Sequence, residues 1–246
     1  MPTEHHGEVR TLVLLPGLMC DHSVWEPVMH LLPPHVQARV ADYGPCDSLT
    51  TMAERTLAAH EGALDIAGHS MGARVALEMM RLAPGRIGRV ALLGSGYAPL
   101  AAGEQGQAER SKRQGFVDLA RSQGVRAMAQ EWVKGMVPAS RLSDATLISA
   151  ILDMCSRKSV AHFEGQIQAL LNRPDAAPVL KGWQRKVWVL CGEWDAWANV
   201  AQHQAMAALL PQAHLQVLEG VGHMFPMENP DQLAAEFRQW LQEPLN

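Results

Sequence analysis

A buried strand, a turn in which two glycines bracket a serine, and a helical pattern follow one another around residue 70. The run Gly68-His69-Ser70-Met71-Gly72 separates the apolar segment 64–67 from a helix that we expect over 73–82. This order is the context of the G-x-S-x-G motif. The spacing has a steric reason, because a serine at the apex of so tight a turn needs small residues two positions away. It leaves the Ser70 hydroxyl above the sheet, close to the unpaired N–H groups of a helix N-terminus.

Short apolar runs alternate with helical patterns on both sides of this motif. We predict strands over residues 10–15, 36–41, 64–67, 89–93, 186–191 and 214–218, and helices near 22–32, 49–61, 73–82, 200–210 and 230–241. Continuous apolar strands separated by helices indicate a parallel sheet that is covered on both faces. The pattern therefore predicts an α/β fold.

The alternation stops in the middle of the chain. From residue 97 to residue 183 no strand is predicted, and helical patterns occur near 108–123, 125–136, 144–156 and 160–171. One α/β core with a helical insertion explains this better than two tandem domains. We expect residues 1–96 and 184–246 to form the core and residues 97–183 to form the insertion.

Composition narrows the class of protein. The 246 residues are 48% hydrophobic and 19% charged, with a formal net charge of −4 and no run of basic residues. These values predict a globular protein without nucleic-acid or membrane partners. The N-terminal segment lacks the pattern of a signal peptide. The four cysteines form no C-x-x-C pair, which favours reduced thiols and a cytoplasmic location.

Three predicted strand ends carry the residues of a nucleophilic site. Ser70 follows the strand 64–67, Asp195 follows the strand 186–191, and His223 follows the strand 214–218. Loops after the carboxyl ends of parallel strands open on the same edge of the sheet, so these side chains can converge. A serine needs a base to remove its proton, and the base needs a third group to orient it. Glu193 and Glu219 compete with Asp195 for that third role, and we interpret His69 as a packing or hydrogen-bonding residue.

The chain resembles the α/β-hydrolase-fold serine hydrolases, in the branch of compact bacterial carboxylesterases with a helical cap. The motif around Ser70, the Gly-x-x-Asp ending at Asp195, and the glycine-flanked His223 occur in the chain order of that family. The resemblance covers nearly the whole chain, although the cap matches in kind rather than in sequence. It implies a mostly parallel sheet of about six to seven strands, shortened at its N-terminal edge because residues 1–9 can hold little more than one strand. It favours Asp195 as the acid and implies no metal and no organic cofactor.

The resemblance also implies an oxyanion hole, which is a pair of backbone N–H groups that stabilise the charged intermediate. The donors would be the N–H groups of Met71 and Leu18. Many relatives have His-Gly where this chain has Pro16-Gly17. The proline removes one N–H and a polar side chain, so we expect the shape of this loop to differ.

The substrate pocket is the least constrained prediction. Apolar side chains of the insertion and of the catalytic loops suit an aliphatic or aromatic acyl group. We expect the pocket to include Met19, Trp25, Trp132, Trp194 and Met224, with Trp197 and Phe225 as further candidates. Arg110, Lys112, Arg113 and Arg157 are able to bind a carboxylate or a carrier phosphate, although solvated positions are the simpler expectation.

These features predict a monomeric or homodimeric enzyme that acts on a small molecule. The reaction would be hydrolysis of a carboxylic ester, thioester or lactone through an acyl-enzyme on Ser70. One alternative is hydrolysis of a carbon–carbon bond in a vinylogous diketone by the same residues. Another is a binding protein that keeps the fold and senses a ligand without turnover. Haloalkane cleavage is disfavoured because it needs a carboxylate at position 70.

Overall fold

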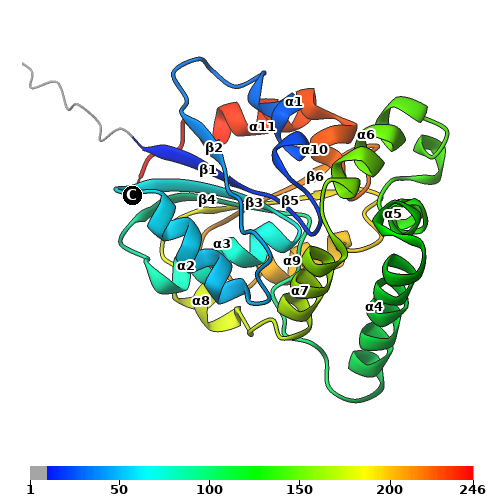
Figure 1. The fold of residues 1–246 in the computed structure, drawn as a ribbon. Coiled ribbons are helices and arrows are strands. Elements are labelled where there is room, and N and C mark those ends of the chain that lie inside the picture. The colour runs from blue at the N-terminus through cyan, green and yellow to red at the C-terminus, as the bar shows by residue number, and fades with distance from the viewer. Residues whose placement is uncertain (1–9, 246) are drawn as a thin grey trace, which may run out of the picture.

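In the computed structural model, which describes residues 10–245, the strands form one fully parallel sheet (Figure 1). The six strands of this range lie in the order β2-β1-β3-β4-β5-β6. Their bounds are β1 (Thr11–Leu15), β2 (Ala38–Val40), β3 (Leu64–His69), β4 (Ile87–Leu93), β5 (Val187–Gly192) and β6 (Ala213–Leu218). The predicted α/β class and the predicted parallel sheet are confirmed. The strand that residues 1–9 were expected to hold lies outside the described residues.

Burial explains why the central strands are apolar along their whole length. Every residue of β3 and β5 is buried, while most of β6, at the edge of the sheet, is only partly buried. Strands that are covered on both faces have no solvent side on which to place polar residues.

Helices cover both faces of the sheet. The helices α2 (Leu49–Ala59), α3 (Met71–Leu82) and α8 (Ala177–Gly182) lie below it in Figure 1, and α1 (Glu26–Met29) and α11 (Pro230–Trp240) lie above it. The helix α9 (Val200–Ala207) packs on β5 and β6. The short helix α10 (Phe225–Glu228) precedes α11.

The helical segment between β4 and β5 lies beyond the carboxyl ends of the strands (Figure 1). It contains α4 (Gly103–Gln123), α5 (Val125–Trp132), α6 (Ala145–Ser156) and α7 (Val160–Leu171), with single turns at Val133–Gly135 and Ala139–Arg141. The helix α8 comes later in the same segment but packs against α3 on the face of the sheet.

Two predicted helices differ from the structure. Residues 22–32 do not form one helix, because a single turn at His22–Val24 ends at Trp25 and α1 begins at Glu26 with Pro27 in its first turn. Proline suits the first turn of a new helix, because the N–H that it lacks would have no partner within that helix. The short helices α8 and α10 were not predicted.

The strand order places a crevice at one edge of the sheet. The chain runs from β1 to β2 on one side and then crosses to β3 on the other, so the order reverses between β1 and β3. Ligand sites in open parallel sheets form at such a reversal, outside the carboxyl ends of the strands. The loop after β1 and the Ser70 turn after β3 flank this point.

Candidate active site

Ser70 lies at the apex of a tight turn between β3 and α3. Its backbone has φ 56° and ψ −116°, a conformation that non-glycine residues rarely adopt. The flanking glycines are required by close backbone approach. A Cβ on Gly68 would collide with the carbonyl of Gly72, and a Cβ on Gly72 would collide with the carbonyl of Leu15. The local sequence therefore folds into this turn because two positions have no side chain.

The structure brings Ser70, His223 and Asp195 together from the ends of three strands. His223 Nε2 lies 2.9 Å from Ser70 Oγ, and His223 Nδ1 lies 2.8 Å from Asp195 Oδ2. Because the carboxylate accepts a hydrogen bond from Nδ1–H, Nε2 is free to accept one from the serine hydroxyl. Both Asp195 and His223 are buried. A hydroxyl held in this way can lose its proton to the imidazole and attack an electrophile.

Asp195 is held as a carboxylate by its surroundings. Burial by itself raises the pKa of this carboxyl, but His223 and the N–H groups of Ala198 and Trp197 outweigh burial and leave the pKa below its usual value. Those two N–H groups donate to Asp195 Oδ1 at 2.8 Å each. The competing Glu193 is exposed and accepts a hydrogen bond from the Gly220 N–H instead.

His69 supports the loop that carries His223. Its Nε2–H donates to the carbonyl oxygen of His223 at 2.7 Å, and the ring is fully buried. Burial, with a smaller contribution from the nearby His223, lowers the pKa of His69 to about 3. The imidazole is therefore neutral and serves as a hydrogen-bond donor to the backbone.

The expected oxyanion donors face the same space as Ser70. Leu18 and Met71 both line the cavity that contains Ser70, and within residues 10–245 no group accepts a hydrogen bond from either N–H. Gly17 allows the loop after β1 to approach, since a Cβ there would lie 3.2 Å from the Cβ of Ser70. The next residues are held in place, because Met19 has φ 60° and its N–H donates to the Gln166 side chain at 2.8 Å.

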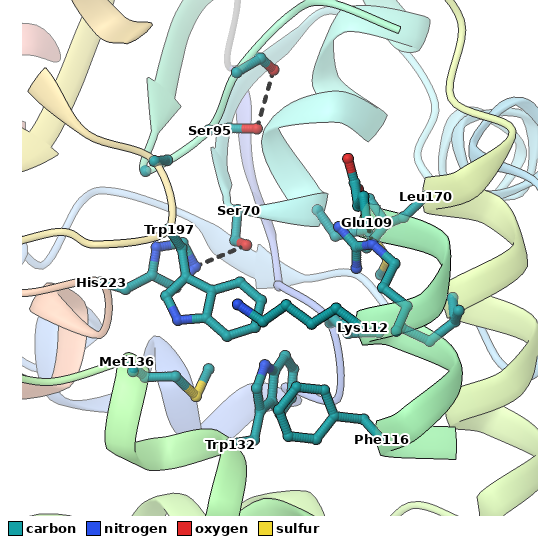
Figure 2. A pocket seen from close by; sticks show the side chains of 18 of the residues that line it. Ser70, Ser95, Glu109, Lys112, Phe116, Trp132, Met136, Leu170, Trp197 and His223 are labelled. Atoms are coloured by element: carbon teal, nitrogen blue, oxygen red, sulfur yellow. Dashed lines mark hydrogen bonds and ion pairs between the residues drawn. The ribbon is translucent and has the colours of Figure 1, made fainter. Parts of the chain in front are cut away.

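A cavity of about 520 Å³ opens above Ser70 and His223. Figure 2 shows Trp132 and Phe116 opposite these two residues. The larger apolar side chains of its lining come mainly from the helical segment; the lining includes Leu18, Met71, Phe116, Trp132, Met136, Phe163, Ile167, Leu170 and Trp197. The volume is within the range of small-molecule sites.

Of the five predicted pocket residues, only Trp132 lines this cavity. Trp25 is fully buried between the sheet and α11, where its ring stacks on Phe237. Met19 and Met224 are fully buried in the core, and Trp194 is 60% exposed outside the cavity. They were predicted as apolar residues in or near the loops that carry the expected catalytic and oxyanion residues, and a position in a loop does not determine the direction of a side chain. Of the two further candidates, Trp197 lines the cavity and Phe225 does not.

Charged residues also line the cavity, interleaved with the apolar ones. They are Arg74, Lys112, Arg113 and Arg173, with Glu109 and Glu131. Lys112 and Arg113 thus lie at the site, whereas Arg110 is exposed elsewhere on α4 and Arg157 pairs with Asp21. Arg74 and Arg173 were not predicted from the sequence as residues of the site. For Arg74 a signal was present, since it lies one helical turn beyond Ser70.

The helical segment also holds the loop of His223. The carbonyl oxygen of Met136 accepts hydrogen bonds from the N–H groups of His223, at 2.7 Å, and of Met224, at 3.2 Å. Gly222 lies against Pro138, where a Cβ would come within 2.8 Å of the proline ring. The segment between β4 and β5 therefore contacts the loops on both sides of Ser70.

A family model described as the alpha/beta hydrolase family matches residues 12–236. The chain belongs to the alpha/beta hydrolase family. A search of solved structures finds an esterase from Thermogutta terrifontis with malate bound, at 22% identity and a TM-score of 0.83, covering 96% of this chain and 90% of that one. It also finds the enol-lactonase of Burkholderia xenovorans LB400, at 20% identity and a TM-score of 0.83, covering 98% of this chain and 94% of that one.

A bromoperoxidase from Bacillus anthracis is also similar to this alpha/beta hydrolase, at 17% identity and a TM-score of 0.80, covering 97% of this chain and 94% of that one. At these identities the likenesses establish the fold of the chain and leave its substrate open. No helix of the described residues is long and apolar enough to span a membrane.

Proposed function

We propose that this alpha/beta hydrolase is a serine hydrolase that cleaves a small to medium carboxylic ester, thioester or lactone. The observation that carries the proposal is the continuous hydrogen-bond chain from Ser70 through His223 to Asp195. Each member follows a different strand, so a chance alignment of all three is a poor explanation. The esterase and the enol-lactonase among the similar structures support the same class of reaction.

The proposed reaction starts with transfer of the Ser70 hydroxyl proton to His223 Nε2 while Oγ bonds to the substrate carbonyl carbon. The Asp195 carboxylate stabilises the imidazolium that forms. The carbonyl oxygen becomes an oxyanion, and the N–H groups of Leu18 and Met71 are the proposed donors to it.

The remaining steps return the enzyme to its starting state. The bond from the carbonyl carbon to the leaving group breaks, and His223 gives its proton to that group. His223 then takes a proton from water while the water oxygen bonds to the acyl carbon. The bond from the acyl carbon to Ser70 Oγ breaks, His223 returns the proton to Oγ, and a carboxylic acid is released.

We further propose that helices α4 to α7 form a cap over this site. These helices supply most of the apolar lining of the cavity, including Trp132, Phe163 and Leu170. The cap would select the acyl group by its size and polarity. The proposed unit is a monomer or homodimer in the cytoplasm, and all four cysteines are free and buried.

The alternative of carbon–carbon bond hydrolysis keeps a specific observation in its favour. Cleavage of a vinylogous diketone calls for polar side chains near the serine to hold a dienol carboxylate, and Arg74 and Lys112 line the cavity. The two reactions separate by substrate, because only esters, thioesters and lactones release an alcohol, a thiol or a hydroxy acid.

The first experiment is intact mass spectrometry after treatment with a neutral alkyl fluorophosphonate. The wild-type chain should gain one adduct, and Ser70→Ala and His223→Ala should gain none. Ser95→Ala is the matched control, because Ser95 also lines the cavity but its hydroxyl donates to the Gly96 carbonyl. His203 Nε2 accepts only from the Ser95 backbone N–H, so no histidine of the described residues is bonded to this hydroxyl. An adduct that survives in Ser70→Ala would overturn the assignment. A panel of methyl esters, lactones and dienoates then separates the two reactions.

A further inference from the structure

The charged residues that line the cavity, called the wall below, include more cations than carboxylates able to neutralise them. Three guanidinium groups, those of Arg74, Arg113 and Arg173, line it together with the ammonium group of Lys112. The two carboxylates on this wall are Glu109 and Glu131. The local excess is positive although the chain as a whole has a formal net charge of −4.

The ion pairs within the wall leave two cations without a carboxylate. Glu109 accepts from Arg173 at 2.7 and 2.8 Å and from Arg113 at 2.8 Å, so one carboxylate serves two arginines. Glu131 pairs with Lys134, which lies outside the cavity. Arg74 donates to the carbonyl oxygen of Ala98 at 3.0 Å and has no carboxylate partner among the described residues.

Lys112 occupies the remaining edge of the cavity. Its Nζ lies 4.8 Å from the centre of the Trp197 ring, and Figure 2 shows the side chain running from α4 toward Trp197, on the side where Ser70 and His223 lie. The ring of Trp197 is 6.4 Å from the ring of His223. Trp197 therefore lies between the ammonium group and His223, and no hydrogen-bond acceptor among residues 10–245 uses the three ammonium donors.

Arg74 is placed where it can reach a bound substrate. It follows Ser70 by one turn of α3, an axial rise of roughly 6 Å. Burial, together with the neighbouring Arg173 and Arg113, lowers the pKa of this guanidinium, because its charge is partly removed from water and faces like charges. An anion that enters the cavity would relieve both penalties and gain charge-assisted hydrogen bonds.

We propose that Arg74 and Lys112 form a carboxylate subsite, so that the substrate is an ester or lactone with a carboxylate a few bonds from the scissile carbonyl. This proposal rests on the proposed serine hydrolase activity and names the substrate class of that site. A single carboxylate suits the wall better than a phosphate dianion, because Glu109 and Glu131 lie on the same wall and limit the excess of positive charge.

The test compares pairs of esters that differ only in the charge of one group. Monomethyl glutarate and methyl glutaramate place a carboxylate or its neutral amide on the acyl side. Carboxymethyl butyrate and carbamoylmethyl butyrate do the same on the alcohol side. The wild-type enzyme should prefer the carboxylate in one pair, with kcat/KM at least about tenfold higher, as expected for one charge-assisted hydrogen bond. No preference in either pair would overturn the subsite.

Variants then assign the preference to particular residues. Arg74→Gln should remove most of the preference, measured as the ratio of kcat/KM for the carboxylate to kcat/KM for its neutral amide. Arg74→Lys should keep part of this ratio. Lys112→Gln should lower it further. Arg110→Gln is the matched control, because Arg110 is on the same helix as Lys112, is exposed and does not line the cavity. A preference that Arg74→Gln and Lys112→Gln both leave unchanged contradicts the assignment.

Two readouts separate failure of the subsite from failure of the enzyme. Fluorophosphonate labelling of Ser70 uses a neutral probe and reports the nucleophile alone. Calorimetry of glutarate binding to Ser70→Ala, with and without Arg74→Gln, reports the subsite without turnover. Labelling with no glutarate binding and no ester preference overturns the subsite only, whereas binding without labelling overturns the hydrolase and leaves the anion site standing.

Discussion

The side chain of Gln166 in α7 accepts a hydrogen bond from the backbone N–H of Met19, at 2.8 Å, in the loop after β1. Gln166 is buried, and Met19 has the positive φ of a constrained turn. The preceding residue is Leu18, whose N–H is a proposed oxyanion donor. A residue of the helical segment therefore fixes the backbone beside the proposed oxyanion hole, although the two are 147 positions apart in the chain.

Replacing Gln166 with leucine should impair both stability and rate. The buried Met19 N–H would lose its acceptor, which costs about 1–3 kcal/mol and lowers Tm by several degrees. Displacement of Leu18 should slow Ser70 labelling and ester turnover by about tenfold or more. Gln166→Glu should retain most of the rate, because a carboxylate oxygen can accept the same bond. Gln168→Leu, at an exposed position of the same helix, is the control. A lower Tm with an unchanged rate would restrict Gln166 to a structural role.

Replacing Asp195 with asparagine should leave the fold intact and abolish most of the activity. The amide oxygen can still accept from the N–H groups of Trp197 and Ala198, but the amide no longer stabilises a charged His223 or fixes its tautomer. We expect the labelling rate of Ser70 to fall by about three to four orders of magnitude. Glu193→Gln, in the same loop, should stay within about twofold of wild type. Equal losses in the two variants would mean that the labelling rate depends on the structure of the loop and not on the Asp195 carboxylate.

The buried Glu228 should make stability depend on pH. Burial raises the pKa of this carboxyl to about 7 from an ordinary 4.5, and its Oε1 has no hydrogen-bond partner among residues 10–245. Because the pKa is higher in the folded state than in the unfolded state, the protonated carboxyl contributes fully to the stability of the fold below pH 4.5. This contribution to stability is lost as the pH rises through 7.

Glu228→Gln removes that dependence. The Tm of the variant should therefore rise relative to that of wild type between pH 5 and pH 8. The matching change in the free energy of unfolding is at most about 3 kcal/mol, at roughly 1.4 kcal/mol for each pKa unit. Thermal unfolding at four or five pH values measures it. A difference that stays flat across this range would show that Glu228 is ionised in the folded protein at pH 5.

The turn at Ser70 should tolerate no side chain at Gly72. A Cβ there would overlap the backbone carbonyl of Leu15, the last residue of β1, and backbone atoms cannot move aside as the end of a flexible side chain can. We expect Gly72→Ala to destabilise the protein by about 3 kcal/mol or more, or to prevent soluble expression. At Gly85 a Cβ would have no neighbour within 4 Å, so Gly85→Ala should be nearly neutral. Denaturant unfolding compares the two, and similar midpoints would contradict the steric account of the turn.

Much of the core could be predicted because its elements follow local rules. The strand predicted over 64–67 became Leu64–His69, and the one over 186–191 became Val187–Gly192, since both are continuously buried. The convergence of Ser70, Asp195 and His223 followed from the geometry of parallel strands. None of these needed knowledge of how distant side chains pack.

The pocket could not be predicted, because it depends on how each helix is rotated. Arg110 and Lys112 lie two residues apart on α4, yet only Lys112 lines the cavity. Successive residues of a helix point about 100° apart, so such a pair faces different directions. The packing of α4 against α7 and α5 determines which of its faces points to the cavity. The sequence of α4 is mainly polar and does not indicate that face.

The carbonyl of Met136 and the side chain of Gln166 limit how the helical segment can be exchanged, in evolution or by engineering. Exchanging residues 97–183 for the cap of another hydrolase would remove one acceptor from the His223 loop and another from the Met19 loop. If the grafted segment is chosen only for its substrate preference, the His223 loop and the Met19 loop would therefore lose these bonds and become disordered. A successful chimera must carry over both acceptors, so the proposed cap cannot be exchanged independently of the loops beneath it.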